Sequence, residues 1–301
     1  MAPPTDAATL WAERTYQKDV PQDIARFRHL LESYSGIPPA EVDDHLLRIR
    51  DRAWAVARFP CLGRWSFTDL RLVDDPVFRS AVARLKDPRS GDALLDVACC
   101  LGQVVRQLVA EGVPPERLHG TDLSPAFLDL GFELFRDRAR FPPGAFVAAD
   151  LLQPDELHEV GEKATSSANA ELSGSGPLRG KVTLVHAANF FHLFPWEEQV
   201  RAATRIVSFL QPGRTDAVVF GGQVGCPDPA QAEVEPGEGG PNRRRRRYLH
   251  NLASWQRLWD EVGRETDTRW RVEARFVGKL PFQIPGFPEE CHYLKFAVYQ
   301  T

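Results

Sequence analysis

The sequence predicts an α/β fold in which helices cover both faces of a mostly parallel sheet. Short apolar segments alternate with amphipathic helical segments between residues 92 and 222. This alternation is typical of parallel strands joined by helical crossovers. Two late strand-like segments, 269–278 and 292–300, are joined by a loop alone. Since a parallel pair requires a longer crossover, we expect these two strands to be antiparallel.

Composition limits the classes of function. The chain has 301 residues, 43% hydrophobic and 26% charged, with a net charge of -4, so it has ample material for a core and no general attraction to nucleic acid or membrane. No apolar run approaches the roughly 20 residues of a membrane helix, and the N-terminus lacks a signal-peptide pattern. The five cysteines show no paired or metal-ligand spacing. We therefore expect a cytoplasmic protein with reduced thiols and no metal.

The first 60 residues read as a helical cap or lid, and residues 61–301 as the main domain. Apolar residues recur at helical spacing in 21–37 and in 38–60, which Gly36 and Pro60 bring to an end. In the main domain, strands are expected at 92–99, 117–123, 144–152, 181–191 and 216–222, and helices at 101–112, 124–137, 195–213 and 254–266. Two polar segments, 161–176 and 226–247, are expected to be flexible insertions.

The first strand leads into the loop Ala-Cys-Cys-Leu-Gly, which has one glycine. Small residues, Ala98, Cys100 and Gly102, stand at the usual spacing after Asp96, so the loop suits a nucleoside better than a pyrophosphate. Asp122 and Asp150 end the next two strands, where they can bind a ribose and an adenine amine. Each aspartate alone fits a turn or a helix cap equally well. Three acids at successive strand ends favour a nucleoside ligand.

The segment LLDVACCLGQVVRQLVAEGVPPERLHGTDLSPAFLDLGFELFRD resembles the class I S-adenosylmethionine-dependent methyltransferases. The double cysteine, GTDL, NFFHLF and SWQRLWDEV resemble a fungal branch of polyketide and meroterpenoid biosynthesis, whose members often esterify a carboxyl group. The resemblance covers roughly residues 62–301 and, more loosely, the N-terminal helices. It implies a Rossmann-like, seven-stranded sheet with an antiparallel last strand, and S-adenosylmethionine as cofactor.

The resemblance also implies a set of cofactor contacts. It places the methionine part of the cofactor against the first loop and Asp96, and the ribose at Asp122. The adenine would lie at the residues that follow the second and third strands. The sulfonium would lie beside the residues that follow the fourth strand. The resulting set is Asp96, Ala98, Cys99, Cys100, Gly102, Asp122, Leu123, Asp150, Leu151, Asn189 and Phe190. At Ala98 and Cys100 this chain departs from the glycine that is commoner in the wider superfamily. The resemblance also implies a lid, so Tyr16 in the N-terminal segment is expected to close over the cofactor and is assigned to the substrate site. A loose terminus is the alternative.

A methyl sulfonium is already a strong electrophile, so the enzyme must align the nucleophile and exclude water. A carboxylate needs no base at neutral pH, whereas a phenol benefits from one. His192, just after the fourth strand, is our candidate for a base or for a hydrogen-bond donor to a carboxylate. A structural histidine at the start of the next helix is the alternative. His186, within the strand, is expected to bond to a neighbour.

The substrate site is expected to be apolar with a few polar anchors. Phe191 and Trp196 flank His192, although core packing explains such residues equally well. The arginine run 243–247 is most simply a solvated loop. Its position after the fifth strand also allows Arg247, together with His250, to anchor an acidic substrate.

These observations predict an O-methyltransferase that acts on a carboxyl or hydroxyl oxygen of an apolar natural product. A methyltransferase-fold enzyme that catalyses a cyclisation or dehydration is the first alternative. A non-catalytic or RNA-modifying protein that uses the arginine run is the second. The expected partner is a small molecule, with no nucleic acid and no membrane, and a homodimer that exchanges N-terminal helices remains open.

Overall fold

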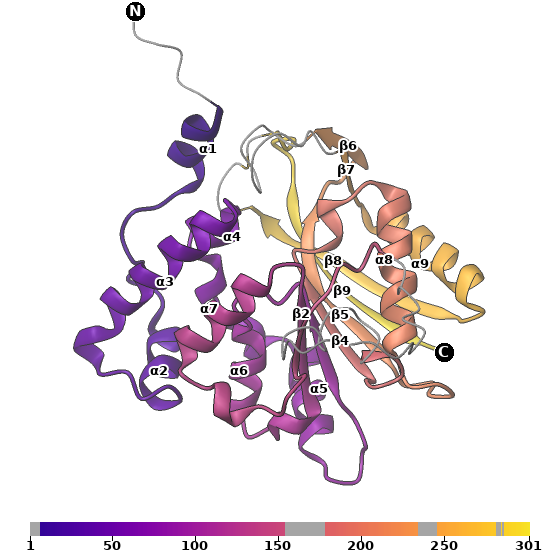
Figure 1. The fold of residues 1–301 in the computed structure, drawn as a ribbon. Helices are drawn as coiled ribbons and strands as arrows, with labels where there is room; N and C mark the ends of the chain where they lie inside the picture. Colours follow the sequence, from indigo (N-terminus) through magenta and orange to yellow (C-terminus); the bar gives the residue numbers. More distant parts are fainter. Residues whose placement is uncertain (1–6, 154–177, 234–245, 281–283, 285) are drawn as a thin grey trace, which may run out of the picture.

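The computed structural model describes residues 7–153, 178–233, 246–280, 284 and 286–301. Its centre is a seven-stranded sheet in the order β3-β2-β1-β4-β5-β9-β8 (Figure 1). The strands are β1 (Leu94–Val97), β2 (Leu118–Asp122), β3 (Phe146–Ala148), β4 (Leu184–Ala188), β5 (Val218–Gly225), β8 (Trp270–Lys279) and β9 (His292–Gln300). β9 runs antiparallel to both β5 and β8, and the other pairs are parallel. The predicted Rossmann-like sheet is confirmed.

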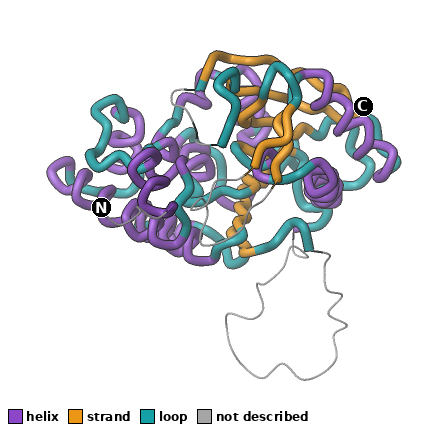
Figure 2. The backbone as a smooth tube through the Cα atoms, turned by 90° about the horizontal axis from the view of Figure 1, so that it is seen from above, coloured by secondary structure: helices purple, strands orange, loops and turns teal. Residues whose placement is uncertain are grey.

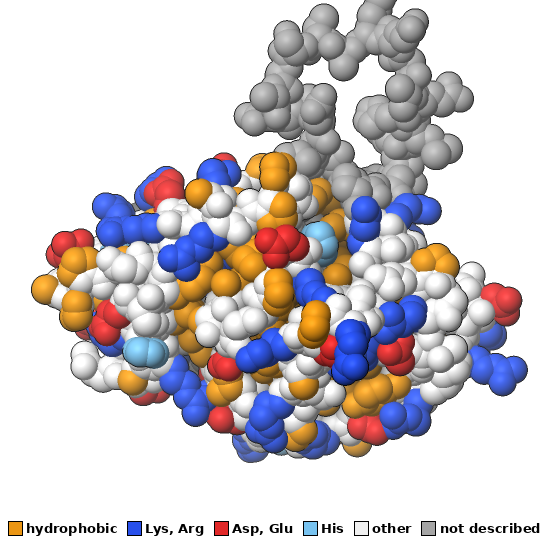
Figure 3. All heavy atoms as spheres, turned by 90° about the horizontal axis from the view of Figure 1, so that it is seen from below, with side chains coloured by type: hydrophobic (Ala, Val, Ile, Leu, Met, Phe, Trp, Pro, Cys, Tyr) orange, Lys and Arg blue, Asp and Glu red, His pale blue; other side chains and the backbone are white. Residues whose placement is uncertain are grey.

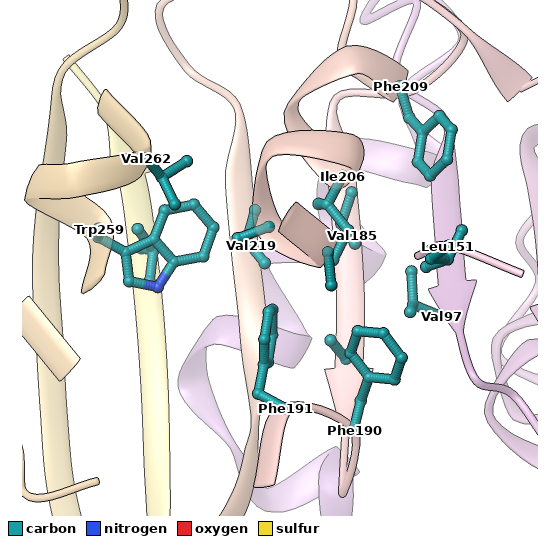
Figure 4. Packing of buried hydrophobic residues seen from close by; sticks show 14 of the residues in the cluster. Val97, Leu151, Val185, Phe190, Phe191, Ile206, Phe209, Val219, Trp259 and Val262 are labelled. Atoms are coloured by element: carbon teal, nitrogen blue, oxygen red, sulfur yellow. The ribbon is translucent and has the colours of Figure 1, made fainter. Parts of the chain in front are cut away.

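Helices lie on both sides of the strands, as the view from above shows (Figure 2). One face packs against α8 (Trp196–Phe209) and α9 (Leu252–Thr266), through a cluster that includes Val185, Ile206, Val219 and Trp259 (Figure 4). The other face packs against α5 (Pro76–Lys86), α6 (Gln103–Ala110) and α7 (Pro125–Phe135). The sequence patterns predicted all of these helices except α5.

The N-terminal cap consists of α1 (Ala7–Thr15), α2 (Ala25–Ser33), α3 (Val42–Val56) and α4 (Pro60–Gly63). Apolar residues of α2 and α3 pack against α7, beside which the two helices lie in Figure 1. Arg50 is fully buried in the cap, where it donates to the carbonyls of Gln17 and Lys18 and stacks on Trp65 at 4.1 Å. These contacts fix the chain between α1 and α2 against α3.

A second, two-stranded sheet follows β5. It pairs β6 (Ala230–Glu233) with β7 (Arg246–Leu249) in antiparallel fashion. β6 and the first two residues of β7 lie in the segment 226–247, for which the sequence predicted a flexible insertion, so these parts of the segment form strands. Residues 234–245 of this segment and the whole of the segment 161–176 lie outside the described residues.

The amino ends of β1 and β5 are held together by charges. Asp92 bonds to the guanidinium groups of both Arg84 and Arg214 at 2.8 and 2.9 Å. Burial raises the pKa of Asp92, but the hydrogen bonds from Arg84 and Thr183 and the positive charges of the two arginines lower it to about 2. Figure 3 shows the molecule from this side, with basic and acidic side chains interspersed. Within the described ranges, no helix combines the length and apolar character needed to span a bilayer.

Candidate functional site

The loop after β1 has the backbone of a glycine-rich loop, although it has one glycine. Ala98, Cys100 and Gly102 all have positive φ, at 51°, 53° and 68°. A non-glycine residue in this left-handed region costs about 1–2 kcal/mol. Ala98 and Cys100 therefore adopt a strained backbone conformation that lets the loop turn tightly. A side chain at Gly102 would also collide with Arg106 and with Phe146.

Asp122, the last residue of β2, holds this loop in place. One carboxylate oxygen accepts the backbone N–H of Cys100 at 2.9 Å, and the other accepts that of Ser124 at 2.9 Å. Burial raises the pKa of Asp122, and the negative charge of Asp96 raises it further. Two buried carboxylates at the same edge of the sheet create a negative potential, which suits a ligand that carries positive charge.

The next strand end is more open. Asp150 is exposed, and its carboxylate accepts the backbone N–H of Leu152 at 2.9 Å. Leu151 is buried, whereas Leu123 is 66% exposed. An apolar side chain so exposed beside Asp122 offers a flat surface for a base. Asn189, after β4, has φ of 52° and donates its backbone N–H to the carbonyl of Gly222, which holds the end of β4 against the middle of β5.

Asp96 pairs with His186 across the neighbouring strands β1 and β4. Nδ1 of His186 lies 2.7 Å from Oδ1 of Asp96, and both side chains are almost fully buried. This bond agrees with the expectation that a neighbour satisfies His186.

A buried ion pair between Arg106 and Asp137 supports the loop after β1. The guanidinium of Arg106 bonds to Asp137 at 2.9 and 3.1 Å and to the carbonyls of Leu101 and Gly102 at 3.4 and 3.3 Å. The hydroxyl of Tyr34, just after α2, donates to the same Asp137 at 2.8 Å. A continuous chain of hydrogen bonds therefore connects the cap to the first loop.

Replacing Tyr34 by phenylalanine is expected to lower the free energy of unfolding by about 1–2 kcal/mol, because a buried carboxylate loses a donor. Chemical denaturation measures this change. Tyr299→Phe, on a half-buried ring of β9, is the control and should change the free energy by less than half as much. Equal losses in the two variants would contradict the prediction.

The structure brings His192 and Arg247 together beyond the end of β4. The guanidinium of Arg247 lies 4.6 Å from the centre of the Phe287 ring, and the His192 ring lies 6.1 Å from the same ring. Both side chains are buried, His192 to 7% exposure and Arg247 to 2%. Burial and, to a lesser degree, the positive charge of Arg247 lower the pKa of His192 to about 3. Nδ1 of His192 has no hydrogen-bond partner within the described ranges.

An apolar cluster from distant parts of the chain lies over these two residues. We call it the lid cluster; it comprises Trp11, Val224, Cys226, Ala232, Leu249, Ile284, Phe287 and Cys291. Trp11 brings α1 to this cluster, where it is 2% exposed. Phe287 of this cluster lies against both His192 and Arg247, which are buried from solvent, and a transfer reaction requires such exclusion of water.

Several predicted site residues lie elsewhere. Phe191 is fully buried against Trp255 at 5.1 Å, so it belongs to the core, and Figure 4 shows it at the end of the packed layer beside Phe190. His250 is also a core residue: its ring nitrogens lie 3.0 Å from Ser254 Oγ and 2.9 Å from Gln199 Oε1. In this structure both side chains have their contacts in the core.

Three further side chains have other partners. The indole N–H of Trp196 donates to Glu261 at 2.9 Å, which ties α8 to α9. The thiol of Cys99 is buried in the core under the loop, and its backbone bonds to Thr121 and Gly102. Tyr16 donates its hydroxyl to Asp51 at 2.8 Å and lies against Arg50, so in this structure it strengthens the cap.

Sequence patterns did not single out Tyr293, on β9. Its ring covers Gly222, at which an added Cβ would lie 2.5 Å from Cε1 and 2.8 Å from the hydroxyl oxygen. Gly222 bonds to Asn189 at the carboxyl edge of the sheet. Burial, and then the charge of Asp69, raise the pKa of Tyr293, so its hydroxyl stays protonated. The sequence signal that could have indicated this contact is the Gly-Gly pair in β5, because two residues without side chains leave room for a large ring on the neighbouring strand.

Known proteins resemble this chain over most of its length. Residues 15–68 match the family model of the meroterpenoid methyltransferase N-terminal domain. The O-methyltransferase phiE of Fungal sp. (strain ATCC 74256) is 36% identical over 90% of this chain and 83% of its own length. The O-methyltransferase atr3 of Stereocaulon alpinum is 36% identical over 91% of this chain and 72% of its own. The methyltransferase trt5 of Aspergillus terreus is 36% identical over 81% and 78%.

The identity extends from the cap through the sheet, and the strand order, the left-handed first loop and the carboxylates at the strand ends agree with the predicted cofactor. The chain therefore belongs to the family of fungal S-adenosylmethionine-dependent O-methyltransferases.

Proposed function

We propose that the enzyme methylates a carboxyl oxygen of an apolar, medium-sized small molecule. The observation that carries this proposal is the buried Arg247 beside the neutral His192. A buried guanidinium can bind an anionic group through a charge-assisted contact that water does not screen. A carboxylate matches its paired N–H donors in geometry and charge.

Residues of this chain that fit the cofactor lie on the first three strand ends. Ala98, Cys100 and Gly102 provide the tight loop, and Asp122 is the candidate for the ribose hydroxyls. Leu123 and Asp150 are the candidates for the adenine. The cofactor supplies an electrophilic methyl group, so the protein has to orient the acceptor oxygen and exclude water.

His192 fits the role of a hydrogen-bond donor or acceptor better than that of a general base. A group whose pKa is about 3 takes up a proton poorly at neutral pH. A carboxylate acceptor is ionised already and needs no base. The low pKa of His192 and the ionised state of a carboxylate acceptor therefore agree with each other, and together they favour an acid over a phenol as substrate.

The test is a panel of apolar carboxylic acids with matched phenols and alcohols, incubated with the enzyme and S-adenosylmethionine. We expect acids to gain one methylene in mass, and the product to revert to the acid in alkali, because esters hydrolyse and aryl ethers do not. An alkali-stable product would contradict carboxyl methylation. An unchanged or dehydrated mass would instead support a cyclisation or dehydration.

Tyr293→Phe is expected to raise KM for the acidic substrate about fivefold, because a single neutral hydrogen bond contributes about 1 kcal/mol. We propose that the hydroxyl of Tyr293 donates to the substrate, while the affinity for S-adenosylhomocysteine stays the same. Tyr299→Phe, at the other end of the same strand, is the control. Steady-state kinetics and calorimetry make the comparison, and an equal KM in both variants would exclude the contact.

The five cysteines are free thiols. This state supports a reducing compartment, and we place the enzyme in the cytoplasm.

A further inference from the structure

The Asp96–His186 pair lies at the point where the order of the strands reverses. The chain runs outward from β1 through β2 to β3 and then returns to β4 on the other side of β1. Asp96 and His186 are direct partners in the β1–β4 register. Ligands of such sheets bind outside the carboxyl ends of the strands at this switch point, and Asp96 lies two residues before the first left-handed residue, Ala98.

The hydrogen bonds assign a tautomer to His186. Asp96 accepts at Oδ1, so Nδ1 of His186 carries the proton, with 2.7 Å between the two atoms. Nε2 is buried with no hydrogen-bond partner within the described part of the chain, and the ring lies 5.4 Å from that of Phe220. A proton on Nε2 would be a buried donor without an acceptor, so the geometry favours the tautomer with its proton on Nδ1.

Burial makes this bond important to Asp96. The carboxylate is 2% exposed, and a buried carboxylate loses the water that would otherwise orient and stabilise it. The Nδ1–H of His186 replaces that water and engages one oxygen. The second oxygen is thereby held in a single direction, which a freely rotating carboxylate would not maintain.

We propose that His186 is a positioning residue that holds Asp96 ready for the ammonium group of the cofactor. The inference rests on the proposed cofactor site. It assigns a role to His186, a strand residue that does not itself contact the ligand. A charge-assisted contact of Asp96 to the ammonium then depends on the proton at Nδ1 of His186.

Two variants and two ligands test this role. His186→Leu removes the donor, whereas His186→Asn places an amide N–H near the position of Nδ1. S-adenosylhomocysteine carries the amino group, and methylthioadenosine retains the nucleoside but lacks the amino acid part. Calorimetry gives the Kd of each ligand for each purified variant, and thermal melting shows that the variant is folded. If His186→Leu does not fold, His186→Gln takes its place, because its longer side chain carries the amide away from the Nδ1 position.

We expect His186→Leu to weaken S-adenosylhomocysteine about 10- to 100-fold, to leave methylthioadenosine within threefold, and to raise KM for S-adenosylmethionine more than it lowers kcat. His186→Asn should stay within about threefold for both ligands. Equal weakening of both ligands, or no weakening of either, would overturn the positioning role. A wild-type protein that binds neither ligand would instead contradict the proposed cofactor site.

Discussion

Replacing Arg247 by methionine is expected to lower kcat/KM for an acidic substrate about a thousandfold. Removing one partner of a buried charge pair costs about 2–5 kcal/mol, and Arg247 is 2% exposed at the end of the sheet. Methionine retains most of the apolar contact with Phe287, so the loss reports on the charge. Arg247→Lys should recover only part of the activity, because an ammonium cannot form the paired contact of a guanidinium.

Arg246→Ala is the matched control for this prediction. Arg246 precedes Arg247 on β7, but its side chain is exposed. We expect its kcat/KM to stay within about twofold, since exposed charges contribute little. Arg247→Met activity within threefold of wild type, in a protein that melts normally, would rule out Arg247 as the anchor.

Replacing Asp122 by asparagine is expected to raise the Kd of S-adenosylhomocysteine about a hundredfold. Both oxygens of Asp122 accept backbone N–H groups, from Cys100 and Ser124. An asparagine offers one oxygen and turns its NH₂ toward a second donor. The loop therefore loses a charge-assisted bond, worth about 1.5–3 kcal/mol, and a ligand hydroxyl loses a charged acceptor as well.

Asp150→Asn is the comparison variant, measured by the same calorimetry. Its carboxylate is exposed and engages one backbone N–H, so we expect less than a tenfold change in Kd. Equal losses in Asp122→Asn and Asp150→Asn would mean that burial and loop support do not distinguish the two carboxylates. The melting temperature separates a loss of affinity from a loss of fold.

The sheet and its cofactor edge could be predicted from the sequence because both depend on local patterns. Apolar runs, helix caps and the spacing after Asp96 lie within a few residues of one another. The structure gives Ala98 and Cys100 the positive φ values that a glycine-rich loop would have. The small size of these side chains was the signal.

The substrate side was harder to predict because it depends on which way side chains turn. Phe191 and His192 are adjacent in the short 3-10 turn Phe191–Leu193, yet one packs in the core and the other lies near Arg247. The strand that carries Arg247 follows a segment rich in proline, glycine and charge, which hid its pairing with β6. The contribution of α1 to the lid cluster through Trp11 depends on long-range packing.

The ring of Tyr293 occupies the place where a Cβ at Gly222 would stand. A residue larger than glycine at position 222 therefore requires a smaller side chain at position 293. Aligned relatives are therefore expected to covary at these two sites, and a homologue with alanine or serine at the first should lack the aromatic ring at the second. Such a swap would remove a phenol from beside Asn189 and mark lineages whose acceptor molecules differ in shape.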